Sequence, residues 1–186
     1  MTRSRAFLIA AILAVQPVLF AQLYSAQYFS SFTTKSGAPS EARQASANAF
    51  AGLAGILTGL SSLESKDDAG ARAGFDAAAR SLAGSIASFS MLGRSSIAGF
   101  KVDLQKLHPD ERTFIADPGL LALGTRKLDT AGDVFALTAG ALSVALTNLN
   151  AFRQNSSVKN YAVVRDDMAL LLRIGQVTTE LLDSAH

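Results

Sequence analysis

The chain of 186 residues contains no cysteine. Without cysteine there is no disulfide framework, no thiolate zinc site and no thiol nucleophile. Histidine is almost as scarce, because only His108 and His186 are present, and neither has a catalytic or ligand partner at a defined spacing. These absences predict a protein that is not an enzyme and that holds no metal ion and no cofactor.

Charge is also in short supply. Charged residues make up 17% of the chain, below the roughly 25% of an average soluble domain. Hydrophobic residues make up 49%, which argues against a disordered chain. No glycine-rich phosphate loop follows a strand pattern, and no basic stripe alternates with aromatics. We therefore expect no nucleic-acid partner and a surface with few charges.

The N-terminus has the pattern of a secretory signal peptide. Arg3 and Arg5 precede an uncharged apolar run, Ala6 to Phe20, and cleavage after Ala21 would place Leu19 and Ala21 at the recognised positions. Removal of residues 1–21 lowers the basic count from 17 to 15, equal to the 15 acidic residues, so the net charge becomes zero. We expect an exported protein, periplasmic or extracellular. The alternative is an uncleaved membrane anchor, since no charge occurs between Ala6 and Thr34.

Residues 22–39 differ in composition from both neighbours. Serine, threonine, glycine and proline are mixed with the aromatics Tyr24, Tyr28, Phe29 and Phe32, and these aromatics lack helical spacing. We interpret this segment as a flexible arm. The folded domain is then 40–186, a length that suits a single core.

Helical spacing dominates the first half of the domain. Ser40 is a suitable N-cap, and Asp67 or Asp68 can cap a second helix after Lys66. Apolar residues follow at three- and four-residue steps in both segments: Phe50, Leu53, Leu57 and Leu60, then Phe75, Ala79, Leu82, Ile86 and Phe89. We expect the second helix to bend at 93–96 and to continue as far as Leu107.

The second half repeats this organisation after a polar segment. Pro109 and Pro118 predict one substantial loop over 108–119. A third helix is expected from about Leu120 to Phe152, with Leu128, Phe135, Leu142 and Leu149 at coiled-coil intervals of seven residues. A fourth is expected from about Ser157 to Asp183. The predicted fold is all-α, an up-down bundle of about four long helices.

Small residues recur at four-residue steps within two of these helices. The first row is Ala47, Ala51, Gly55 and Gly59, and the second is Gly132, Ala136 and Gly140. Glycine disfavours a helix by about 1 kcal/mol relative to alanine, so close packing must offset its presence. We predict that Gly55, Gly59, Gly132 and Gly140 lie where two helices approach closely, within the bundle or else between subunits or in a membrane.

Two stretches lack charge over the length of a membrane span: Ala45 to Leu63 and Val134 to Phe152. Polar residues within the second stretch, including Thr138, Asn148 and Asn150, oppose insertion into lipid. A helix without charge on any face is better explained by surrounding protein, in the bundle interior or at an oligomer interface. Membrane association remains the alternative.

Together these patterns predict an exported, non-enzymatic helical bundle that works by binding. The expected partner is an unidentified protein or a second copy of the chain. The first alternative is a carrier that holds an apolar ligand between helices. Its lining would consist of Phe50, Phe75, Phe89, Phe100 and Phe135. The second alternative is a membrane-associated protein whose N-terminal segment remains as an anchor.

Overall fold

The structure is a computed structural model that describes residues 40–94 and 103–183. Within these residues the protein is all-helical and contains no strand, which confirms the all-α prediction. The predicted signal peptide, the predicted arm and Phe100 lie outside the described residues.

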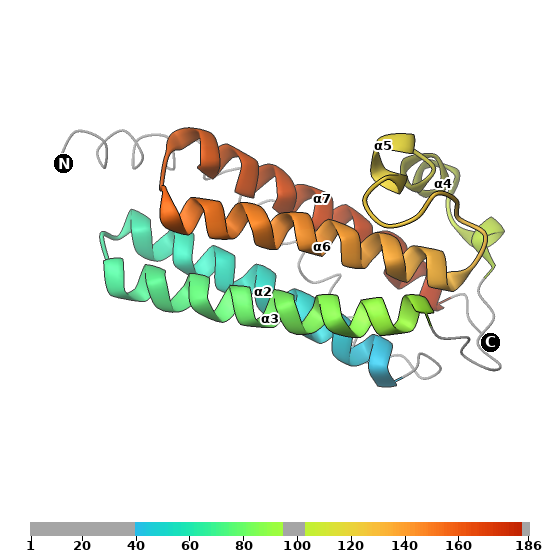
Figure 1. Cartoon of the computed structure of the whole chain (residues 1–186), viewed down its shortest axis with the longest axis horizontal. Coiled ribbons are helices and arrows are strands. Elements are labelled where there is room, and N and C mark those ends of the chain that lie inside the picture. The colour runs from blue at the N-terminus through green and yellow to red at the C-terminus, as the bar shows by residue number, and fades with distance from the viewer. Residues whose placement is uncertain (1–39, 95–102, 184–186) are drawn as a thin grey trace.

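Four long helices lie side by side along the length of the molecule (Figure 1). They are α2 (Ser40–Glu64), α3 (Asp68–Arg94), α6 (Ala131–Gln154) and α7 (Val158–Asp183). A compact segment at one end contains the 3₁₀ turn η1 (Leu104–Lys106) and two short helices, α4 (Pro109–Ile115) and α5 (Pro118–Leu121).

The long helices pack in chain order, α2 on α3, α3 on α6 and α6 on α7. Successive helices run in opposite directions, as their facing residues show: Gly52 meets Leu82, Gly59 meets Phe75, Phe89 meets Phe135, Phe75 meets Phe152, and Thr138 meets Thr178. The four long helices therefore alternate in direction, up, down, up and down, around one core. The core includes Leu82, Leu137 and Leu149, all fully buried.

Local chemistry fixes the helix ends. The turn after α2 places Lys66 at φ 60°, and the amides of Lys66 and Asp67 donate back to Leu63 and Ser62 carbonyls, as in a Schellman motif. At the start of α6, Thr130 Oγ1 accepts from the Asp133 amide at 3.2 Å, and Asp133 Oδ2 accepts from the Thr130 amide at 2.7 Å. This reciprocal capping box begins the helix at Ala131.

The segment between α3 and α6 differs from the sequence prediction. The third long helix was expected from Leu120, but it begins only at Ala131, because the capping box at Thr130 sets its first turn. The expected loop over 108–119 contains α4 and α5, since each proline occupies a first helical position, where its missing N–H costs nothing. Of the expected bend and continuation of the second helix, residues 95–102 lie outside the described residues, and Leu104–Lys106 form a 3₁₀ turn in place of an α-helix.

Candidate functional site

The α2–α3 contact is built on glycine. A Cβ on Gly55 would lie 2.9 Å from both the Ala78 amide nitrogen and the Gly74 carbonyl oxygen, and one on Gly59 would overlap the Phe75 ring. Gly74 is the reciprocal position, because a Cβ there would lie 2.6 Å from the Gly59 amide nitrogen. The sequence-predicted glycines of α2 thus lie where two helix backbones touch.

The two glycines predicted in α6 face different neighbours. Gly132 lies against the end of α3, where a Cβ would be 3.1 Å from the Gly93 carbonyl oxygen. A Cβ on Gly140 would overlap the Leu123 carbonyl oxygen. In the reciprocal contact, a Cβ on Gly124 would overlap the Ala136 carbonyl oxygen. Because Gly140 has no side chain, the segment after α5 packs directly against the α6 backbone. Sequence reasoning missed Gly124, because an isolated glycine in a loop carries no spacing signal.

The phenylalanines proposed as a ligand lining pack mainly against one another. Phe89 lies 5.9 Å from Phe135 between ring centroids. Phe75 packs edge-on against Phe152 at 5.6 Å, and Phe152 was not among the predicted residues. Phe50 is partly buried at the edge of the core. These geometries are typical of aromatic pairs within a core.

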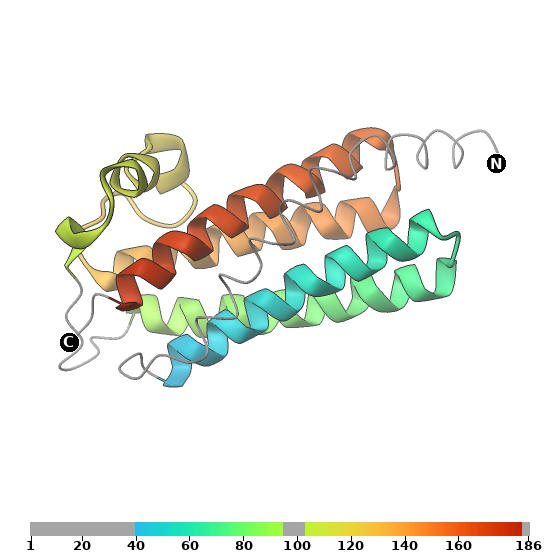
Figure 2. The same ribbon diagram turned by 180° about the vertical axis from the view of Figure 1, so that it is seen from behind.

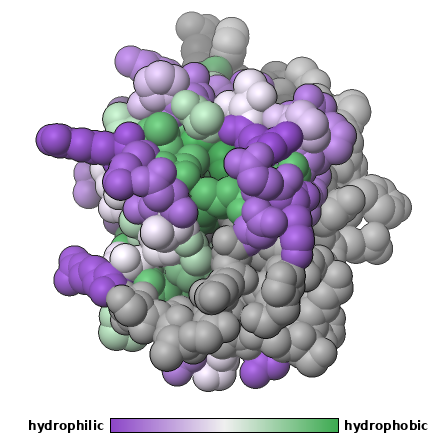
Figure 3. Space-filling view, turned by 90° about the vertical axis from the view of Figure 1, so that its right-hand side faces the viewer, coloured by the Kyte–Doolittle hydropathy of each residue, from purple (hydrophilic) through white to green (hydrophobic). Residues whose placement is uncertain are grey.

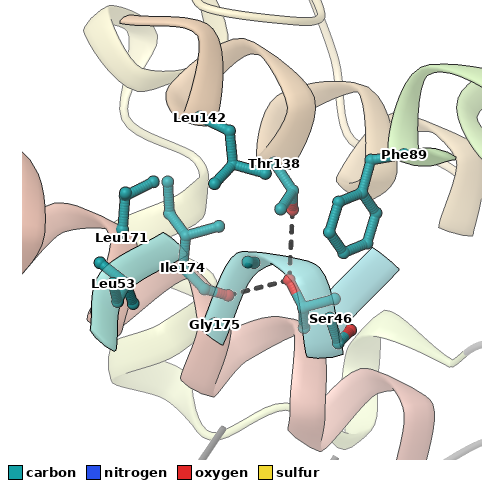
Figure 4. A pocket seen from close by; sticks show the side chains of 10 residues that line it. Ser46, Leu53, Phe89, Thr138, Leu142, Leu171, Ile174 and Gly175 are labelled. Carbon is teal, nitrogen blue, oxygen red and sulfur yellow. Dashed lines mark hydrogen bonds between the residues drawn. The ribbon is translucent and has the colours of Figure 1, made fainter. Parts of the chain in front are cut away.

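A small cavity lies at the centre of the bundle, with a volume of about 10 Å³. All four long helices contribute to its lining, part of which Figure 4 labels: Ser46, Ala49, Leu53, Phe89, Thr138, Leu142, Leu171, Ile174, Gly175 and Thr178. A volume near that of one water molecule is far below the roughly 300–1,000 Å³ of a drug-sized ligand site. An apolar ligand would therefore have to part the helices.

Each long helix contributes one buried hydroxyl near this level: Ser46, Ser85, Thr138 and Thr178. Ser85 donates across to the Ala45 carbonyl at 2.7 Å, and Thr138 and Thr178 each donate to a carbonyl of their own helix at 2.8 Å. The two threonine oxygens also lie 3.2 Å apart (Figure 4). Since each hydroxyl has one proton, one threonine donates to the other across this contact only in place of its own carbonyl bond, while its partner keeps the bond to its helix.

One buried carboxylate joins the short helices to α7. The Glu111 side chain is 5% exposed, and its Oε1 forms an ion pair with Arg173 Nη1 at 3.2 Å. Its Oε2 lies 3.4 Å from His108 Nδ1. The Arg173 guanidinium also covers the Phe114 ring, 5.4 Å from its centroid. An ion pair between a buried carboxylate and a partly exposed guanidinium, together with a cation–π contact, thus holds α4 against α7.

The end of the molecule that carries this segment mixes apolar and polar surface. Figure 3 shows apolar side chains in the centre of this face, framed by hydrophilic ones. Partly buried apolar residues of the segment between α3 and α6 include Leu104, Phe114, Leu123 and Leu128. These side chains complete the core at this end.

Burial of a second carboxyl gives a pH-dependent prediction. Asn148 Nδ2 donates to Asp167 Oδ2 at 2.8 Å between α6 and α7. Burial raises the pKa of Asp167, with a smaller raising effect from Asp166 and an opposing effect from the Asn148 hydrogen bond. A raised pKa means that the folded state holds this proton more tightly than the unfolded state. Asp167 therefore stabilises the fold below its ordinary pKa of about 3.9, and this contribution is lost as pH rises through the folded-state pKa.

We expect Asp167→Asn to raise the free energy of unfolding at pH 7 by a few tenths of a kcal/mol, a small effect because the carboxyl is half exposed to water. The gain should disappear near pH 3.5. Urea unfolding at both pH values measures it. Asp166→Asn, at an exposed neighbouring position, is the matched control and should show no such gain at pH 7. A stability gain for Asp167→Asn that is equal at the two pH values contradicts the assignment.

Together the interior and the helix contacts define an all-helical bundle with a close-packed core. Within residues 40–94 and 103–183, no group of three or more His, Cys, Asp or Glu side chains is placed to hold a metal ion. Comparisons with protein-family models, with curated proteins and with solved structures find no significant match for this chain.

Proposed function

We propose that the protein is an exported, non-enzymatic helical bundle that binds another protein or a second copy of itself through the outward face of α6. We call this surface the α6 outer face; it consists of Ser143, Val144, Thr147 and Ala151, all exposed. The sequence pattern of residues 1–21 supports export.

The observation that carries this proposal is the absence of charge on the α6 outer face. No charged residue occurs between Asp133 and Arg153, although the outward side of a soluble helix usually carries charges. Val144 is 38% exposed, and Thr147 donates its hydroxyl to the Ser143 carbonyl of its own helix at 2.9 Å. The lack of charge on this face agrees with the depletion of charged residues at the core of protein interfaces.

A membrane is the competing explanation for the same residues. By length and composition, α2 and α6 are apolar enough to cross a bilayer, with mean hydropathies of 1.2 and 1.4 over their best stretches. Within the protein, 39% of the residues in the α2 stretch and 50% of those in the α6 stretch are buried. The remaining residues face water, lipid or another protein. A test of the proposal must therefore separate a protein contact from a lipid contact.

A photo-reactive amino acid at Thr147, introduced in the expressing cell, is expected to form cross-links to protein. The same probe at Ala169, which is exposed on α7 near Asp166 and Asp167, is the matched control and should form none. The product mass distinguishes a second copy of the chain from a different partner. Gel analysis and mass spectrometry of the exported fraction provide the measurement.

Three results would reject this proposal. Equal cross-linking from both positions would show random encounter, and no protein cross-link from position 147 would show that the face is unoccupied. Lipid adducts from position 147, with resistance to alkaline extraction, would assign the protein to a membrane. A native mass spectrum with a reproducible small-molecule mass would favour the carrier alternative.

A further inference from the structure

The α6 outer face lies between the outward edges of α3 and α7. α6 packs on α3 on one side and on α7 on the other. Figure 1 shows α6 between these two helices, and Figure 2, the view from behind, has α2 and α7 nearer the viewer and α6 and α3 on the far side. A protein that docks on the α6 outer face therefore also meets side chains of α3 and α7.

The edge of α3 beside this face carries the exposed cation Arg80. Arg80 follows Asp76 by one helical turn, so the two side chains share a face of α3, and Asp76 pairs with Arg153 of α6. Because the two helices are antiparallel, Arg80 lies one turn back from Arg153 along α6, near the level of Thr147. Within the described part of the chain, Arg80 forms no ion pair of its own.

The edge of α7 on the other side carries an anion at the same level. Asp167 faces α6, because its carboxylate accepts from Asn148 Nδ2 at 2.8 Å. Asp166 precedes it on α7 and so lies about 100° further round the helix, with its side chain 67% exposed. Asp166 pairs with Arg165 of its own helix, but a carboxylate this exposed has room for a second cation. The α6 outer face is thus flanked by opposite charges.

This arrangement of charge is complementary to itself in one orientation. Two copies that meet through their α6 outer faces about a two-fold axis parallel to the helices place the α3 edge of each copy against the α7 edge of the other. Arg80 then faces Asp166 of the second copy, and the same pair forms twice. With the two α6 helices antiparallel, Arg80 would face Arg80 and Asp166 would face Asp166, and these like charges oppose the contact.

We propose that the partner of the α6 outer face is a second copy of the chain, docked with the two α6 helices parallel. This assignment rests on the proposed function, since it names the occupant of the same face. The uncharged residues of the face form the centre of the interface, and Arg80 and Asp166 lie at its rim. Rim charges add little affinity, so their role is to select the parallel orientation.

The absence of cysteine allows a test of the orientation with single thiols. Around a parallel two-fold axis each position at the centre of the face meets itself, so Thr147→Cys and Ala151→Cys should each form a disulfide-linked dimer under mild oxidation. Ala169→Cys, exposed on α7, is the matched control and should remain monomeric. If only one of the two variants links to itself, or if they link only when mixed, the helices are antiparallel and the proposal is wrong.

Charge reversal tests the rim pairs. Arg80→Glu is expected to raise the dissociation constant of the dimer about tenfold or more, because two attractive contacts become repulsive. Adding Asp166→Arg exchanges both charges and should restore most of the affinity. Arg43→Glu on α2, outside this face, is the matched control and should have no effect. Sedimentation equilibrium measures the dissociation constants. Equal values for Arg80→Glu and Arg43→Glu, or no recovery in the double variant, overturn the proposal.

Failure of this assignment is distinguishable from failure of the proposed function. A monomer in solution whose photo-reactive group at Thr147 cross-links to a different protein keeps the α6 outer face as a binding surface but rejects the second copy. A monomer without any protein cross-link from Thr147 rejects both. A dimer that links to itself at both thiol positions, with the expected response to charge reversal, supports both.

Discussion

Replacement of Gly74 by alanine is expected to lower the free energy of unfolding by about 2–3 kcal/mol. Alanine is the better helix former by about 1 kcal/mol, so helix propensity alone predicts the opposite sign. The added Cβ would lie 2.6 Å from the Gly59 amide nitrogen, 2.9 Å from its Cα and 3.0 Å from the Gly55 carbonyl oxygen. These are backbone atoms, so relief requires separation of α2 from α3. Urea unfolding followed by circular dichroism measures the change.

Gly84→Ala is the matched control in the same helix. Its nearest neighbour would be Asn48 Nδ2 at 3.4 Å, an ordinary contact with a side chain that can move. We expect this substitution to raise the free energy of unfolding by up to about 1 kcal/mol. Equal stability changes in the two variants would show that α2 and α3 do not approach as closely as the structure describes.

The close helix approach could be predicted in part from sequence. The four-residue spacing of Gly55 and Gly59 indicates a groove on α2, because glycine within a helix needs compensation by packing. The spacing does not identify the partner, since Gly74 becomes opposite only once the length of the intervening turn is fixed. That turn depends on Lys66 at positive φ, a conformation that lysine itself does not signal.

The long helices could likewise be predicted, whereas the segment between α3 and α6 could not. Apolar spacing marks α2, α6 and α7 because one side of each is buried in the core. In the sequence Pro109 and Pro118 indicate a loop, but proline is compatible with both a loop and a first helical turn. Only tertiary contacts, such as that of Glu111 with Arg173, decide between the two.

The burial of the hydroxyl side chains at the centre of the bundle could not be predicted from the sequence either. Serine and threonine within a helix can donate to a carbonyl of the preceding turn, so they occur on buried and exposed faces alike. Thr138 is buried and Thr147 is exposed, yet both form this bond. The phenylalanine prediction failed to anticipate Phe152 because pairing across helices depends on their relative rotation.

Arg173→Met is expected to lower the free energy of unfolding by about 2 kcal/mol, less than for a fully buried pair because Arg173 is 38% exposed. The substitution leaves the Glu111 carboxylate, 5% exposed, without its cation and removes the guanidinium from the Phe114 ring. The loss should be local. Amide hydrogen exchange should accelerate in 104–123 while the centres of α3 and α6 remain protected.

Two further variants separate a buried charge from lost packing. Adding Glu111→Gln to Arg173→Met removes the stranded charge, so the double variant should be more stable than Arg173→Met alone. Arg165→Met on the same helix removes a cation paired with the 67% exposed Asp166, and should change stability by less than about 0.5 kcal/mol. If Arg165→Met and Arg173→Met have equal effects, or if Glu111→Gln gives no recovery, then apolar contacts alone hold α4 against α7. In that case Leu107, Ile115 and Leu120, which are all buried, are the residues to test next.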